Sequence, residues 1–220
     1  MMRRNYWGGG YYGVPFRPYR HELRDIIIAL VAMTIAFALL FNKLLKLNII
    51  YGLVATFIAV LTGFLGHELM HREVARRLGY IAYFRAWFIG LLLALVTALT
   101  GFFIIATPGA TVIGPKVWGY PTRNDELKIA LAGPATNMVF AVIFLPLWLL
   151  LLHDSLSGYA FYVFIIYATN AWLGFFNMLP LALPGIMVDG FRIFRNNIKV
   201  WIAVFIVSVL LMIPMFVPIP

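Results

Sequence analysis

The 220-residue sequence contains no cysteine and few charged residues. Without cysteine there can be no disulfides and no thiolate metal ligands, so a bound metal would have to be held by His and carboxylate side chains. Charged residues make up 11% of the chain, against about a quarter in soluble domains, while 63% of the residues are hydrophobic. This composition predicts an integral membrane protein whose length suits one helical bundle.

Acidic residues are scarcer than basic ones, 8 against 17, which gives a net charge of +9. The basic residues flank apolar segments, as membrane topology requires, so we expect a lipid bilayer around the protein and no nucleic-acid partner. The first 25 residues are rich in Arg, Tyr and Gly and lack the apolar run of a signal peptide. We expect residues 1–25 to form a cytoplasmic juxtamembrane tail and residues 26–220 a single domain.

Six apolar segments have the length of membrane helices and lack the strict alternation of barrel strands. They are Ile26–Phe41, Ile49–His71, Ala86–Ala106, Ile129–Leu152, Tyr159–Leu181 and Val200–Pro218.

The flanking charges indicate how these segments cross. Basic residues precede the first segment and follow the second, third and fifth, whereas the turn at 153–158 contains none. If residues 86–106 crossed fully, every later loop would break the positive-inside rule. We therefore expect a re-entrant hairpin that bends near Thr97–Gly101, with a full crossing as the simpler alternative. The expected fold is an all-α polytopic membrane protein with five transmembrane helices plus this hairpin, or with six transmembrane helices.

A different kind of segment follows the third apolar run. Thr107–Pro115 combines Pro and Gly, which exclude a continuing helix, with β-branched residues that suit an extended strand. We expect a short β segment near residues 107–122. Such a strand would offer unpaired backbone groups along its free edge.

The second apolar segment ends in His67-Glu68-Leu69-Met70-His71. Ionisable groups at membrane depth cost several kcal/mol and normally face a cavity, a partner or an ion. In a helix, residues i and i+4 share one face, so both imidazoles can reach one Zn²⁺. Glu68 can then accept a proton from water at the metal. Two satisfied helix-end histidines are the alternative, but they leave Glu68 unexplained.

Hydrolytic zinc sites commonly have three protein ligands and one open position. The remaining candidates for a third ligand are His21, His153, Glu22, Asp25, Glu73, Asp125, Glu126, Asp154 and Asp189. Most of these precede the first crossing, lie in a polar loop or fall on the opposite side of the membrane, and Glu73 lies off the face of His71. Asp189 follows the fifth segment on the same side as His71, so topology selects it by elimination.

Further motifs accompany this pattern. They are Arg72-Glu73-Val74-Ala75-Arg76-Arg77-Leu78-Gly79 after the second His, Gly133-Pro134-Ala135-Thr136-Asn137, Asn170, Leu173-Gly174-Phe175-Phe176-Asn177-Met178-Leu179-Pro180, and Val188-Asp189-Gly190. Together they resemble the site-2 protease family of intramembrane zinc metalloproteases, in a minimal form without PDZ or CBS modules. The spacing from Asn177 to Asp189 is longer than is usual in that family, with an insert around Pro184-Gly185.

The resemblance implies one Zn²⁺ per chain, held by His67, His71 and Asp189, with Glu68 as the catalytic base. It suggests that Asn137 or Asn177 positions the substrate carbonyl, although an interhelical hydrogen bond would also explain Asn137. The substrate would be a single-pass membrane protein cut during regulated intramembrane proteolysis. A strand near Thr111 and Ile113 could bind the unwound substrate by strand addition. We expect a multi-pass protein of the cell membrane whose active site opens to the cytoplasm.

Two other classes of protein remain as alternatives. A prenyl-protein endopeptidase would tend to take a Glu from a later helix as its third ligand, but the chain has no Glu after Glu126. A non-enzymatic protein would be a catalytically inactive scaffold or an ion-coupled transporter that uses the His/Glu cluster. No paired repeats of the transporter kind are evident, and an intact Glu68 argues against an inactive scaffold.

Overall fold

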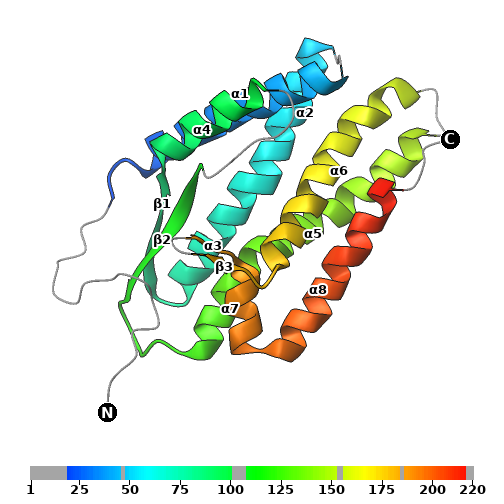
Figure 1. Cartoon of the computed structure of the whole chain (residues 1–220). Coiled ribbons are helices and arrows are strands. Elements are labelled where there is room, and N and C mark those ends of the chain that lie inside the picture. Colours follow the sequence, from blue (N-terminus) through cyan, green and yellow to red (C-terminus); the bar gives the residue numbers. More distant parts are fainter. Residues whose placement is uncertain (1–18, 46–47, 101–107, 153–155, 184–185, 217–220) are drawn as a thin grey trace.

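The computed structural model describes residues 19–45, 48–100, 108–152, 156–183 and 186–216 (Figure 1). Its helices are α1 (Glu22–Leu45), α2 (Ile49–Val60), the π-helical turn η1 (Leu61–Leu65), α3 (Gly66–Arg77), α4 (Phe88–Ala98), α5 (Arg123–Leu152), α6 (Ser157–Met178), α7 (Asp189–Asn196), α8 (Ile198–Met212) and the 3-10 turn η2 (Ile213–Phe216). Its strands are β1 (Tyr80–Ala86), β2 (Gly109–Lys116), β3 (Ala182–Leu183) and β4 (Ile186–Met187).

Five helical stretches in the described part of the chain are long and apolar enough to span a bilayer, which confirms the predicted all-α polytopic class. They are Glu22–Asn42, Ile49–Arg77, Arg123–Leu152, Ser157–Met178 and Ile198–Phe216. The second comprises α2, η1 and α3 and has 29 residues. At a rise of 1.5 Å per residue it is roughly 43 Å long, so it extends well beyond a hydrocarbon core about 30 Å thick.

Local capping explains where several helices begin. The Asn48 side chain accepts hydrogen bonds from the backbone N–H groups of Ile50 and Tyr51 at the start of α2. Asn197 caps α8 in the same way. Before α5, the Asp125 backbone N–H donates to the Thr122 hydroxyl, and the Thr122 N–H donates to the Asp125 carboxylate. This reciprocal pair is a capping box, which satisfies donors that an uncapped helix leaves unpaired.

Helices α5 and α6 run side by side through the bundle, with α3 against α5 and α8 against α6 (Figure 1). Large buried side chains fill the contact between α5, α6 and α8. The rings of Trp148 and Tyr167 stack with centroids 5.5 Å apart, and the Tyr167 hydroxyl donates to the carbonyl of Leu211. This packed half of the molecule supports the helix ends that carry the site.

The third apolar segment does not form one long helix. Only α4 is helical in its described part, and its 11 residues are too few to cross a bilayer. Strands β1 and β2 flank it as an antiparallel pair, and the Trp87 N–H donates to the Pro108 carbonyl at 3.0 Å. The chain therefore leaves and returns at the same place. This excludes the full crossing and agrees with the re-entrant alternative. Of the bend predicted near Thr97–Gly101, Gly101 lies outside the described residues.

The expected β segment is β2, but its partner β1 was not predicted. Side chains of α1 hold the outer edge of β1: Glu22 accepts the Phe84 N–H and Asp25 accepts the Ala86 N–H. Glu22 also accepts hydrogen bonds from Arg72 and Arg76 of α3. The beginning of α1 thus fastens the small sheet to the helix that carries the HExxH motif.

The insert before Asp189 forms a second, two-stranded antiparallel sheet. Ala182 pairs with Met187, and Leu183 pairs with Ile186. The Val188 N–H then donates to the Leu181 carbonyl at 3.4 Å, so the chain comes back to the end of α6 before α7 begins. The hairpin therefore accommodates the extra residues without moving Asp189 away from the bundle.

Candidate metal centre

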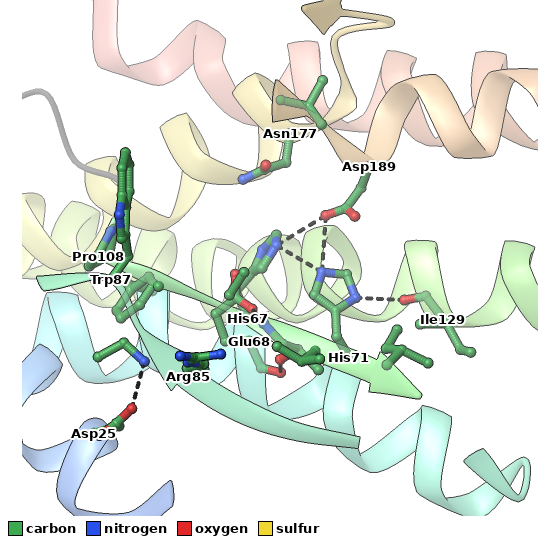
Figure 2. Close-up of a pocket in the computed structure, with 18 of the residues that line it drawn as sticks. Asp25, His67, Glu68, His71, Arg85, Trp87, Pro108, Ile129, Asn177 and Asp189 are labelled. Atoms are coloured by element: carbon green, nitrogen blue, oxygen red, sulfur yellow. Dashed lines mark hydrogen bonds and ion pairs between the residues drawn. The ribbon is translucent and has the colours of Figure 1, made fainter. Parts of the chain in front are cut away.

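Three potential metal ligands meet beside the first half of α3 (Figure 2). His67 and His71 are one turn apart on α3, and Asp189 is the first residue of α7. The Nε2 atoms of His67 and His71 lie 3.1 Å and 3.0 Å from Oδ2 of Asp189 and 3.0 Å from each other. All three residues are buried. The structure thus brings together the two His and the Asp that the sequence selected.

The other ring nitrogens are used by the protein. His67 Nδ1 lies 2.6 Å from Oδ1 of Asn137, and His71 Nδ1 lies 2.6 Å from the carbonyl oxygen of Ile129. Because both partners are acceptors, each Nδ1 carries the proton and each Nε2 presents a lone pair. Such hydrogen bonds to the second nitrogen are typical of metal-binding His residues, since they fix the tautomer and the ring orientation.

Two lone pairs and a carboxylate that converge at 3.0–3.1 Å are stable together only with positive charge between them. The ligand separations are close to the value of about 3.3 Å that a tetrahedral zinc ion with bonds of about 2.0–2.1 Å requires. The donor set therefore fits zinc.

Gly133 of α5 makes room for the two imidazoles. A Cβ at this position would overlap the Nε2 atoms of both His67 and His71. Gly190 has a similar role behind Asp189, because a Cβ there would overlap the backbone of Met178 at the end of α6. Both glycines are needed for close approach: one brings α5 against the His pair, and the other seats α7 against α6.

A buried amide network lies behind His67. The Asn137 side chain has no exposed surface; its Nδ2 donates to the Gly63 carbonyl at 2.7 Å and approaches Oδ1 of Asn170 at 3.4 Å. Asn170 in turn donates to the Thr62 hydroxyl at 2.8 Å. Gly63 and Thr62 belong to η1, a type of turn that is frequent at functional sites. Because Gly63 fixes which end of the Asn137 amide donates, the network also determines the tautomer of His67.

A cavity of about 1160 Å³ opens over the metal ligands. Glu68 lines it, and its Oε2 accepts the Thr111 N–H of β2 at 2.7 Å. Ile113 lines the same wall, while Asn177 of α6 projects toward the His pair from the opposite side (Figure 2). The Asn177 amide nitrogen donates within its own helix, to the Leu173 carbonyl. Arg85, Arg192 and Arg195 also line the cavity.

The predicted substrate-binding residues therefore occupy different environments. Thr111, Ile113 and Asn177 line the cavity, whereas Asn137 is buried behind His67 and its amide is occupied by protein partners. Sequence reasoning did not identify the Ile129 carbonyl or the contact between Thr111 and Glu68. A backbone carbonyl has no sequence signal, and the Thr111 contact joins β2 to a helix residue 43 positions away in the chain.

A family model described as peptidase family M50 matches residues 55–156, a range that includes the HExxH motif and Gly133–Asn137. A curated protein of Methanocaldococcus jannaschii with the name "Putative zinc metalloprotease" is 36% identical over 190 residues, which cover 84% of this chain and 90% of that protein. No solved structure gives a significant match.

Proposed function

Because this chain belongs to peptidase family M50, we propose that it is an intramembrane zinc metalloprotease that hydrolyses peptide bonds within or near transmembrane segments of membrane proteins. The observation that carries the proposal is the buried His67–His71–Asp189 set, whose two His lie on a membrane-length helix. His67 lies roughly 27 Å along that helix from Ile49, which corresponds to the inner end of a hydrocarbon core about 30 Å thick. A metal set at that depth suits a substrate that arrives within the bilayer.

The side chains of His67, His71 and Asp189 would hold the zinc ion. The hydrogen bonds from the two Nδ1 atoms to Asn137 and to the Ile129 carbonyl fix the orientation of both imidazole rings. A zinc ion in this position supplies a Lewis acid that polarises water and the scissile carbonyl. Two helices position these ligands. Helix α3 places both rings on one face, and the start of α7 brings the carboxylate opposite them.

Glu68 is the residue that handles the proton. It follows His67 directly and lines the cavity beside the ligands. Its carboxylate takes a proton from the attacking water as the water oxygen bonds to the carbonyl carbon. It then delivers this proton to the amide nitrogen as the C–N bond breaks, so that the products are a carboxylic acid and an amine. Glu68 thus acts first as general base and then as general acid.

The cavity walls suit an extended peptide. A transmembrane helix shields its peptide bonds in its own hydrogen-bonded ladder, so part of the substrate must unwind and its backbone groups need new partners. The edge of β2 at Thr111 and Ile113 offers such partners by strand addition. From the other wall, Asn177 can orient the scissile carbonyl once its amide turns from the Leu173 carbonyl. For Asn137 the proposed role is orientation of His67.

The basic residues favour one orientation in the membrane. They gather around the end of the bundle that carries the site, on α3, α7, the end of β2 and the first turns of α5 and α8: Arg72, Arg76, Arg77, Lys116, Arg123, Arg192, Arg195 and Lys199. By the positive-inside rule, this end and the N-terminus face the cytoplasm. We place the protein in the cell membrane, with its active site open to the cytoplasm.

Cleavage of a model single-pass substrate in liposomes tests the proposal. The zinc-loaded protein should cut the substrate, and Glu68→Ala should lose at least about 100-fold in rate because it lacks the proton carrier. Zinc content, measured by mass spectrometry, should stay at one ion per chain in the variant, because Glu68 is not a ligand. Cleavage by Glu68→Ala at the parental rate would refute the mechanism.

A further inference from the structure

Thr111 holds Glu68 through two separate hydrogen bonds. Its backbone N–H donates to Oε2 of the Glu68 carboxylate at 2.7 Å, and its hydroxyl donates to the Glu68 backbone carbonyl, also at 2.7 Å. The residue assigned to proton transfer is thus hydrogen-bonded to β2, the strand assigned to substrate binding. The Thr111 backbone N–H therefore takes part in both assigned roles.

The direction of that amide follows from the register of the sheet. In antiparallel pairs, residues alternate between pairs that bond to each other and pairs whose N–H and C=O groups point outward. Trp87 bonds to Pro108, whereas the N–H groups of Phe84 and Ala86 point outward, to Glu22 and Asp25. Thr111 is opposite Phe84, so its N–H points outward on the other edge, into the cavity.

A substrate strand that adds to this edge must use the same outward-pointing groups. Ile113 is two residues further along β2 and presents its backbone to the same edge. An amide N–H makes one linear hydrogen bond, so the Thr111 N–H cannot serve both the Glu68 carboxylate and a substrate carbonyl at full strength. Strand addition and the Glu68 contact therefore compete.

We propose that Thr111 is a positioning residue that restrains the Glu68 carboxylate while no substrate is bound. An extended substrate releases Glu68 when one of its carbonyl groups accepts the hydrogen bond from the Thr111 N–H. The inference rests on the proposed function. It makes proton transfer conditional on pairing along β2. The preferred substrates are segments that are already unwound over at least the span from Thr111 to Ile113, because helical carbonyls are occupied in their own ladder and cannot compete for the N–H.

Thr111→Pro tests this conditional release, with Ile113→Pro as the matched control. Both substitutions remove an N–H that the ladder with β1 does not use, and proline is tolerated at such edge positions. Strand β2 already contains Pro115. Only the first variant removes a hydrogen bond to Glu68. Each variant is assayed with a long extended substrate that reaches both positions and with a short peptide that carries the same scissile bond but stops before β2.

For the short peptide, Thr111→Pro should raise kcat by about tenfold or more, since a charge-assisted hydrogen bond no longer restrains Glu68. For the long substrate, the same variant should raise KM and leave kcat within about twofold. Ile113→Pro should raise KM for the long substrate and should not show the gain in kcat for the short peptide that Thr111→Pro shows. A decrease of kcat by the same factor for both substrates in Thr111→Pro would overturn the inference, because Thr111 would then hold Glu68 in its working position. An unchanged kcat for the short peptide would overturn it as well.

A second measurement does not depend on cleavage. In the full-length metal-free protein, amide exchange at Thr111 measured by NMR should be slow, and Glu68→Ala should accelerate it by about tenfold or more. Equal exchange in the two proteins would show that Glu68 does not hold this amide. If the parent protein cleaved no substrate at all, the proposed function would fail while this exchange result still decided the contact. Thr111→Val, which keeps the N–H and loses only the hydroxyl bond, should retain slow exchange.

Discussion

Replacement of Gly133 by alanine probes the metal centre at its tightest contact. The new Cβ would overlap the Nε2 atoms of both His67 and His71, so each ring would have to retreat by about 1 Å to reach ordinary van der Waals separation. Metal–ligand distances in proteins keep to within about 0.2 Å of their ideal values. Rings displaced by that amount cannot both remain ligands while Asp189 stays in place.

The expected loss of zinc affinity is at least about 100-fold, or about 2.7 kcal/mol, because changes behind the ligands alone cost 10–100-fold. The metal-free protein should change much less. Alanine in a helix is favoured over glycine by about 1 kcal/mol, while overpacking costs about 1–3 kcal/mol, so the free energy of unfolding should move by no more than about 2 kcal/mol.

The assay is a competition between Gly133→Ala and a chelator of known zinc affinity, followed by thermal unfolding of the metal-free protein in detergent. Gly158→Ala is the matched control, since a Cβ at Gly158 meets no atom within 4 Å and should leave zinc affinity unchanged. If Gly133→Ala bound one zinc ion as tightly as the parent, the imidazoles would not occupy the space beside α5, and the assigned centre would be wrong.

Four further substitutions separate ligand, orienting, substrate-positioning and supporting roles. Asp189→Ala should lose stoichiometric zinc in elemental analysis, and full occupancy would place the third ligand elsewhere. Asn137→Leu should lower zinc affinity 10–100-fold by chelator competition, because His67 loses its orienting acceptor, whereas Asn177→Leu should keep zinc and lose about 100-fold in kcat; equal zinc affinities in these two variants would contradict the division of roles. Glu22→Gln should lower the free energy of unfolding by about 1–3 kcal/mol because it weakens the tie between α1, α3 and β1. The exposed Glu73→Gln serves as its comparison and should change stability less, so an equal loss would show that the Glu22 contacts carry no special weight.

Much of the membrane bundle could be predicted from the sequence, because the sequence features that determine it are local. Apolar length predicted the five spans, and the charge pattern predicted that residues 86–106 return to their starting side. The motif spacing predicted that His67 and His71 share a helix face, and topology then selected Asp189 across 118 residues. The family match confirmed the resemblance to site-2 proteases.

What the sequence did not predict depends on contacts between distant segments. Strand β1 has only seven residues, and its pairing with β2 and its hydrogen bonds to Glu22 and Asp25 make it a strand. Asn137 has the residue type expected to bind a carbonyl, but whether that carbonyl belongs to the substrate or to Gly63 depends on how α5 packs against η1. The hydrophobic periodicity of a helix predicts which face is buried, but it does not predict which single atoms meet across a helix contact.

The small hairpin of β3 and β4 has a consequence for recognising distant relatives. Its antiparallel pairing lets the connection between α6 and α7 grow outward while the two anchor points, Met178 and Gly190, remain in contact. Searches that demand a fixed number of residues between the asparagine motif and the aspartate would overlook proteins built this way. The same loop is a natural place to graft a tag or a reporter, since length there is decoupled from the chemistry.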